Sequence, residues 1–125
     1  MRKSLHLSIV LLLFVGSFTC FSQSKQEKKL LKSGNSHFKS KEYSNAEVYF
    51  TQLVSINPKI VEYNFKYGVC LFNTSKVKTN SIQYLKFAAD KTSVLGEVHY
   101  YLARSYQIAF RFKDALKLYS GLQAK

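Results

Sequence analysis

The chain has 125 residues, of which 46% are hydrophobic, and its 19 lysine and arginine residues against 7 aspartate and glutamate residues give a formal net charge of +12. This length fits one small domain, and the hydrophobic content excludes an intrinsically disordered chain. The positive charge favours contact with anionic surfaces or polymers.

The N-terminus differs in kind from the rest of the chain. Two basic residues precede an uncharged, largely apolar stretch over residues 4–24, with small residues at Cys20 and Ser22. This layout is typical of a secretory signal peptide. We therefore expect residues 1–22 to be cleaved and the protein to be exported to the periplasm or cell envelope, with Gln23 first. An uncleaved membrane anchor over residues 4–24 is the alternative. Cys20 fits a lipid-attachment site poorly, because a phenylalanine and a threonine precede it.

The first helix pair is predicted from the 3.6-residue spacing of its apolar residues. The first helix is expected over about residues 25–40. A short polar turn follows, and Ser44 or Asn45 is expected to cap the second helix. That helix continues to Ile56 and ends before Pro58, because the residue before a proline is pushed out of the helical region.

Two further helix pairs are expected. In the second pair the first helix opens near Lys59 and closes at residues 73–75, and its partner ends near Asp90. In the third pair a turn at residues 111–112 divides the two helices. No alternating β-strand pattern occurs, so the expected fold class is all-α.

Three kinds of position recur at intervals of 34 or 35 residues: a small residue on the first helix, a small residue on the second, and a large one a turn later. Helices approach closely only where side chains are small, so these positions are expected to form the packing contacts between repeats. They are Gly34, Gly68 and Ala103; Ala46, Ser81 and Ala115; and Phe50, Leu85 and Tyr119, with Pro58 closing the first unit. The extra residue of the second unit lies around residues 76–78.

This pattern resembles the tetratricopeptide repeat over nearly all of the chain from Lys25 onward. The resemblance implies a right-handed α-solenoid of three helix-turn-helix repeats, at about 27–60, 61–95 and 96–125, within a domain over 23–125. Ser81 and Leu85 depart from the usual alanine and aromatic residue, and the tryptophan of the family pattern is absent.

A narrower resemblance rests on the SKQEKK lead-in, the INP boundary and the helices YNFKYGVC and VHYYLARSY. These segments look like the N-terminal repeat region of Bacteroidetes envelope proteins that carry OmpA-like domains, some of them associated with type IX secretion. The resemblance implies a scaffold that joins envelope or secretion machinery. The peptidoglycan-binding domain of those proteins has no counterpart in this sequence, so that activity is not implied.

Catalytic, cofactor-binding and metal-ligating motifs are missing from the sequence, and we expect no enzyme and no cofactor. His37 and His99 fall at positions that the repeat uses for packing. Cys70 is the single cysteine of the expected mature protein, which excludes an intramolecular disulfide, and it is interpreted as a packed apolar residue.

The resemblance implies a peptide-binding groove lined by the first helix of each repeat, suited to an extended or helical peptide. The alternative is that some of these residues pack between repeats. The groove residues are Leu31, Asn35, Phe38, Phe65, Val69, Phe72, Tyr100, Arg104 and Gln107. A second class of function is a basic surface that binds an anionic polymer or membrane, whereas sequence-specific binding of nucleic acid is not expected.

The last predicted helix carries three large residues, Leu118, Tyr119 and Leu122, with no further helix to cover them. A repeat array needs a polar terminal face. We therefore expect further repeats, another domain, a partner or self-association through this C-terminal helix to cover them.

Overall fold

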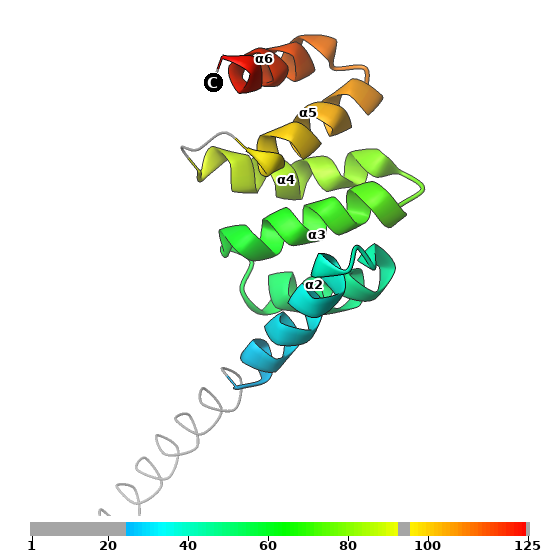
Figure 1. Cartoon of the computed structure of the whole chain (residues 1–125), viewed down its shortest axis with the longest axis vertical. Coiled ribbons are helices and arrows are strands. Elements are labelled where there is room, and N and C mark those ends of the chain that lie inside the picture. The colour runs from blue at the N-terminus through cyan, green and yellow to red at the C-terminus, as the bar shows by residue number, and fades with distance from the viewer. Residues whose placement is uncertain (1–24, 93–95, 125) are drawn as a thin grey trace, which may run out of the picture.

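The computed structural model describes residues 25–92 and 96–124, and within them every regular element is a helix (Figure 1). The predicted all-α class is confirmed for this part of the chain. The expected signal peptide at 1–22, the alternative anchor at 4–24 and Cys20 lie outside the described residues. None of the described helices is both long and apolar enough to span a membrane. The elements are a first helix over residues 25–39, α2 (Tyr43–Ile56), α3 (Val61–Thr74), the 3-10 helix η1 (Lys78–Ser81), α4 (Ile82–Asp90), α5 (Glu97–Ile108) and α6 (Phe112–Gln123).

The helices stack in chain order, each one reversing direction against the one before (Figure 1). From α2 to α6 each helix packs on the next, and α3 also contacts α5 across α4 and η1. The first helix also contacts α3, so the first helix, α3 and α5 lie side by side.

Close contact between neighbouring helices occurs at the glycines. A methyl group added at Gly34 would lie 3.1 Å from Cβ of Tyr49 on α2. The contact at Gly68 is tighter, because a methyl group there would lie only 2.7 Å from Cγ of Leu85 on α4. Ala103, the third residue of this series, is fully buried. The small side chains thus mark where successive helices come nearest.

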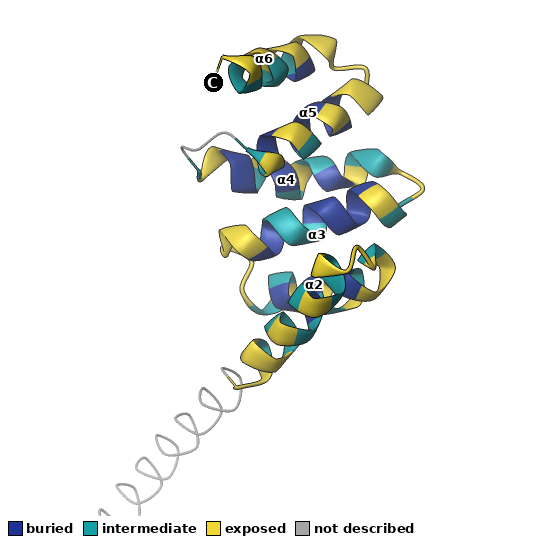
Figure 2. Cartoon of the chain, viewed as in Figure 1, coloured by how far each residue is buried: buried dark blue, intermediate teal, exposed yellow. Residues whose placement is uncertain are grey.

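The apolar core follows the stack as two clusters, and each helix from α2 to α6 has buried residues (Figure 2). One cluster is centred on the first helix pair and α3, and the other on α3 to α6. Their buried members are Ala46, Phe50, Leu53, Tyr63 and Cys70 in the first, and Val69, Leu85, Ala89, Leu102, Tyr106 and Ala115 in the second.

The first and third helix pairs share the same tight turn. Lys41 has a left-handed backbone, with φ of 60°. Its N–H donates to the carbonyl of Phe38 at 3.0 Å, and the N–H of Glu42 donates to that of His37 at 2.9 Å. This is the Schellman arrangement that ends a helix. It recurs at Phe110, where φ is 58° and the two equivalent bonds measure 3.1 and 2.8 Å.

The expected helix cap at Ser44 or Asn45 is wrong. α2 begins at Tyr43, one residue after Glu42, and no side chain caps it. The Schellman turn explains the difference, because it reverses the chain within three residues and leaves no room for a longer turn. Asn45 instead donates to the carboxylate of Glu42 at 3.3 Å.

Two features were not expected from the sequence. The turn after α3 continues into η1, a 3-10 helix that ends at Ser81. On α6, Leu116 remains 68% exposed, whereas Leu118, Tyr119 and Leu122 are half-buried. The outer side of α6 is therefore the more open one.

Candidate functional site

The first helix, α3 and α5 together present a continuous surface, here called the three-helix face. Between the first helix and α3, Asn35 accepts a hydrogen bond from Lys66 at 2.6 Å. Between α3 and α5, the rings of Phe72 and Tyr101 meet edge to face at 5.5 Å. Polar and aromatic contacts thus join all three helices.

Lys66 lies at the centre of this face. Its ammonium group forms an ion pair with Glu62 one turn earlier, and it lies 5.7 Å from the ring centre of Phe38 and 5.9 Å from that of Phe50. Only 19% of its side chain is exposed. A cation held against aromatic rings and a carboxylate is fixed in position rather than free in solvent.

Aromatic contacts extend from Phe38 into the core and across to α3. Phe38 packs edge to face against the buried Phe50 of α2 at 6.0 Å and against the half-buried Phe65 of α3 at 6.3 Å. Such edge-to-face pairs are a favoured geometry for aromatic rings. The rings of the first helix and α3 therefore form one rigid apolar strip.

The α5 end of the face carries a second cation. The guanidinium of Arg104 lies 5.2 Å from the ring centre of Phe72 and 5.8 Å from that of Tyr100. Lys78 covers the same Phe72 ring at 5.3 Å and donates to the Phe72 carbonyl at 2.8 Å. Tyr100, 43% exposed, packs on its neighbour Tyr101. Two cations thus share one phenylalanine ring.

The nine predicted groove residues fall into three classes of exposure. Val69 is fully buried and Phe72 is 5% exposed, so Val69 belongs to the core and Phe72 offers its ring mainly to the two cations. The reason is that α3 lies between α2 and α4 and also contacts α5, which leaves little of it open. The half-buried residues are Leu31, Asn35, Phe38 and Phe65, and the exposed ones are Tyr100, Arg104 and Gln107.

Sequence reasoning missed the residues that organise the face electrostatically. Glu62 and Lys66 are four residues apart on one helix, a spacing that places opposite charges in contact. That spacing was readable from the sequence. The approach of Asn35 to Lys66 was not, because it depends on how the first helix lies against α3.

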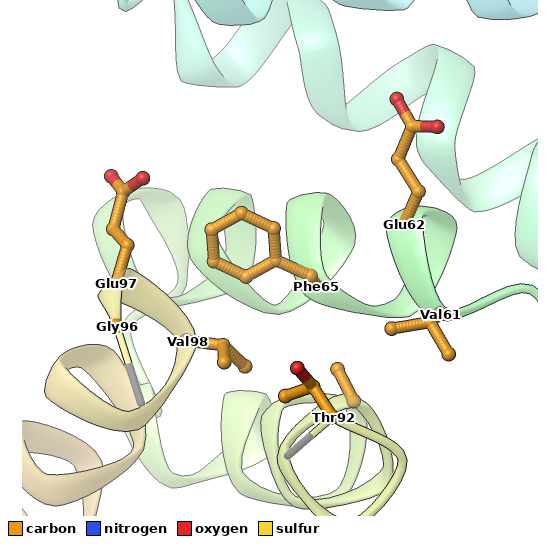
Figure 3. A pocket seen from close by; sticks show the side chains of 8 residues that line it. Val61, Glu62, Phe65, Thr92, Gly96, Glu97 and Val98 are labelled. Atoms are coloured by element: carbon orange, nitrogen blue, oxygen red, sulfur yellow. The ribbon is translucent and has the colours of Figure 1, made fainter. Parts of the chain in front are cut away.

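A cavity of about 540 Å³ opens at the edge of this face, between the starts of α3 and α5 and the end of α4. Figure 3 shows the Phe65 ring between the carboxylates of Glu62 and Glu97, with Val61 and Val98 beside the opening. The cavity is apolar inside and acidic at its mouth. We call it the acid-rimmed pocket; its lining is Val61, Glu62, Phe65, Ala88, Thr92, Gly96, Glu97 and Val98.

Burial raises the pKa of three weakly acidic groups. It raises the pKa of Tyr101 to about 12, aided by a hydrogen bond with Tyr43. It also raises the pKa of Tyr63 to about 12, aided by a hydrogen bond to Glu27. Burial, with the charge of Glu47, raises the pKa of the Cys70 thiol to about 12. A buried, protonated thiol is a poor nucleophile.

The two histidines lie in different settings. His99 is buried, with 6% of its surface exposed, whereas His37 is partly open, stacks on Tyr49 and contacts the Glu42 carboxylate at 2.5 Å. No group of three or more potential metal ligands occurs within residues 25–92 and 96–124.

Comparison of the chain with models of known protein families gives no match, and a search of curated proteins gives none either.

Proposed function

We propose that this chain is an exported, tetratricopeptide-like interaction scaffold, not an enzyme, which binds a peptide segment of a protein partner on the three-helix face. The partner belongs to an envelope or secretion assembly. The observation that carries the proposal is the series of aromatic rings across three helices, in which Lys66 lies over Phe38 and Arg104 lies over Phe72 and Tyr100. An apolar strip with fixed cations suits a peptide that presents apolar side chains and carboxylates.

The recurrence of packing positions supports the repeat assignment. Gly34 and Gly68 both lie where a helix approaches its neighbour, and the residues of the second series are buried in all three units. The left-handed turns at Lys41 and Phe110 are separated by 69 residues, 110 minus 41, which equals two of the repeat intervals. Backbone and side-chain positions therefore support the same period.

Site-specific photo-crosslinking in cells tests the binding face. A photoreactive phenylalanine at Tyr100, 43% exposed on α5, is expected to form a protein adduct in envelope fractions. The matched control is the same group at Val48, which is 59% exposed on α2, outside the face. Adducts at both sites in equal amount, or none at Tyr100, would refute binding at this face. Mass spectrometry of the same material tests export, since an N-terminus at Gln23 is expected.

A second function, adhesion to an anionic surface, is favoured by the first helix. Four exposed lysines recur on it with helical spacing and line one shallow depression. The acid of this helix, Glu27, accepts hydrogen bonds from Asn57 and Tyr63 and so is directed toward the rest of the fold. A basic surface of this kind attracts acidic polymers or lipid headgroups in a salt-dependent manner. The lysines are Lys25, Lys28, Lys29 and Lys32.

Vesicle co-sedimentation distinguishes this function. Binding to vesicles with anionic lipid is expected to fall in the Lys28→Glu/Lys29→Glu variant and with rising salt. The control variant, Lys113→Glu, changes an exposed lysine on α6 and should bind as the parent does. Equal binding of neutral and anionic vesicles would argue against a basic adhesive surface.

A further inference from the structure

The mouth of the acid-rimmed pocket carries two exposed carboxylates, which favour an occupant with a positive charge. The chain holds only 7 acidic residues against 19 basic ones, yet two of the seven lie at this opening. Glu62 is paired with Lys66, whereas Glu97 is in none of the ion pairs formed among the described residues. A fitting occupant carries an apolar group for the cavity and a cation for Glu97.

The turn between α5 and α6 presents that combination. Phe110 is 81% exposed, the highest value among the large apolar residues of the described chain, and Phe112 is 59% exposed. Their rings meet edge to face at 6.0 Å. Lys113 follows and is exposed, outside the ion pairs. We call these three residues the aromatic turn.

The turn that Phe110 occupies does not explain its side chain. Phe110 has a φ of 58°, a left-handed conformation in which glycine is common and a bulky side chain is rare. The left-handed conformation serves the Schellman turn, as it does at Lys41, but a ring that is 81% exposed is not held in the fold by burial. An observed outlier of this kind is grounds for a functional hypothesis.

The pocket and the aromatic turn lie at opposite edges of the stack. The pocket is formed by the starts of α3 and α5 and the end of α4, whereas the aromatic turn follows the end of α5 (Figure 1). The twelve residues of α5 separate them by about 18 Å. One molecule therefore cannot fill its own pocket with its own turn.

We infer that the acid-rimmed pocket receives the aromatic turn of a second copy of this chain. The rings of Phe110 and Phe112 enter the apolar cavity beside Phe65, and the ammonium group of Lys113 faces Glu97. The contact uses a different surface on each partner, so it is heterologous. In a pair, one copy still has a free pocket and the other a free turn. Further copies can therefore add to the pair, and the assembly becomes a ring or a filament. Because Phe65 also belongs to the three-helix face, self-association competes there with a bound peptide. The inference stands without the proposed function, because it needs no other partner.

The test is a complementation experiment on the full chain. Sedimentation analysis from about 10 µM to about 1 mM suits the weak affinity of a small interface. The parent is expected to grow in mean mass with concentration. Phe110→Gly/Phe112→Ser removes the turn, Glu97→Lys reverses the charge at the pocket, and each variant alone should stay monomeric. An equimolar mixture should give one-to-one dimers and nothing larger, because only one productive contact remains.

The controls separate this contact from general effects. Lys41→Gly relieves the equivalent left-handed turn of the first helix pair, and Glu42→Lys reverses an exposed carboxylate elsewhere; both should associate as the parent does. Circular dichroism checks that every variant folds, and Phe110→Gly alone should melt no lower than the parent, because it removes a strained residue. A monomeric parent, a variant pair that fails to combine, or single variants that still associate would each overturn the inference.

Discussion

We expect alanine to affect stability in opposite directions at the two equivalent helix contacts, Gly34 and Gly68. An added methyl group at Gly34 would lie 3.1 Å from Cβ of Tyr49 and 3.3 Å from the Phe50 ring, a contact that a shift of a few tenths of an ångström relieves. At Gly68 it would lie 2.7 and 2.9 Å from side-chain carbons of Leu85 and 3.2 Å from its backbone nitrogen. Leu85 is fully buried, and one of the close atoms is its backbone nitrogen, which cannot move without shifting α4.

The magnitudes follow from two opposing terms. Alanine stabilises a helix interior by about 1 kcal/mol relative to glycine. Overpacking a filled core costs about 1–3 kcal/mol. Gly34→Ala should therefore be neutral or stabilising, by up to about 1 kcal/mol, and Gly68→Ala should lose up to about 2 kcal/mol. Gly34→Leu, which places a full side chain in the contact, should lose about 1–3 kcal/mol or more.

Thermal and urea unfolding measure the difference. For a domain of this size, 1 kcal/mol corresponds to a melting shift of roughly 4–8 °C. Leu85→Ala alone should cost about 2–5 kcal/mol through the cavity it leaves. In the Gly68→Ala background it should cost less, because the new methyl group occupies part of that cavity. Equal stability of the two alanine variants, or strict additivity at Gly68 and Leu85, would refute the assigned helix contacts.

Three further predictions concern single side chains. Ser81→Ala should lower the free energy of unfolding by about 1 kcal/mol, because the hydroxyls of Ser81 and Ser105 share a buried 2.8 Å hydrogen bond. The double variant Ser81→Ala/Ser105→Ala should lose less than the sum of the two single losses. Additive losses in urea unfolding would contradict this. The hydrogen bond with His37 lowers the pKa of Glu42 from 4.5, so Glu42 stabilises the fold above pH 4.5 and loses that effect as the pH falls through its lowered pKa. The melting-temperature gap between the parent and Glu42→Gln should therefore close in acid, and a gap that widens there would be contrary evidence. In a variant whose other cysteine is serine, Cys70 should react with a thiol reagent at pH 8 only after unfolding, because it is buried with a pKa of about 12; rapid reaction of the native protein would show that it is accessible.

The sequence predicted the helices better than the turns between them. α2 ends at Ile56, as Pro58 requires, and α3 ends at Thr74, within the predicted polar triplet. These limits depend on local chemistry, which a single sequence contains. The start of α2 was wrong because a helix can end in a left-handed residue of any type, and Lys41 carries no sequence mark of that conformation.

The candidate site was less predictable than the fold. Periodicity identifies which residues share a helix face, but it does not show how many neighbours cover that face. On α3, which has neighbours on several sides, Val69 is fully buried whereas Phe65, four residues earlier, is half-buried. The acid-rimmed pocket could not be predicted at all. It depends on Glu62 and Glu97 lying at adjacent helix starts, and on the end of α4 leaving space between them.

The second helix pair differs most from the other two pairs, at Ser81 and Leu85. Each of these residues contacts a neighbour that suits it. Where the other pairs have alanine, Ser81 brings a hydroxyl into the core. This hydroxyl donates a hydrogen bond to the carbonyl of Lys78, and the hydroxyl of Ser105 on α5 contacts it. Where the other pairs have an aromatic ring, Leu85 fills the space above Gly68 more tightly than Phe50 does above Gly34. A buried polar group costs stability unless it is paired, and a core contact costs stability unless its shapes fit. Ser81 with Ser105 and Leu85 with Gly68 therefore form coupled pairs across neighbouring helices. Replacing one member alone by the residue that the other helix pairs have would disturb its partner.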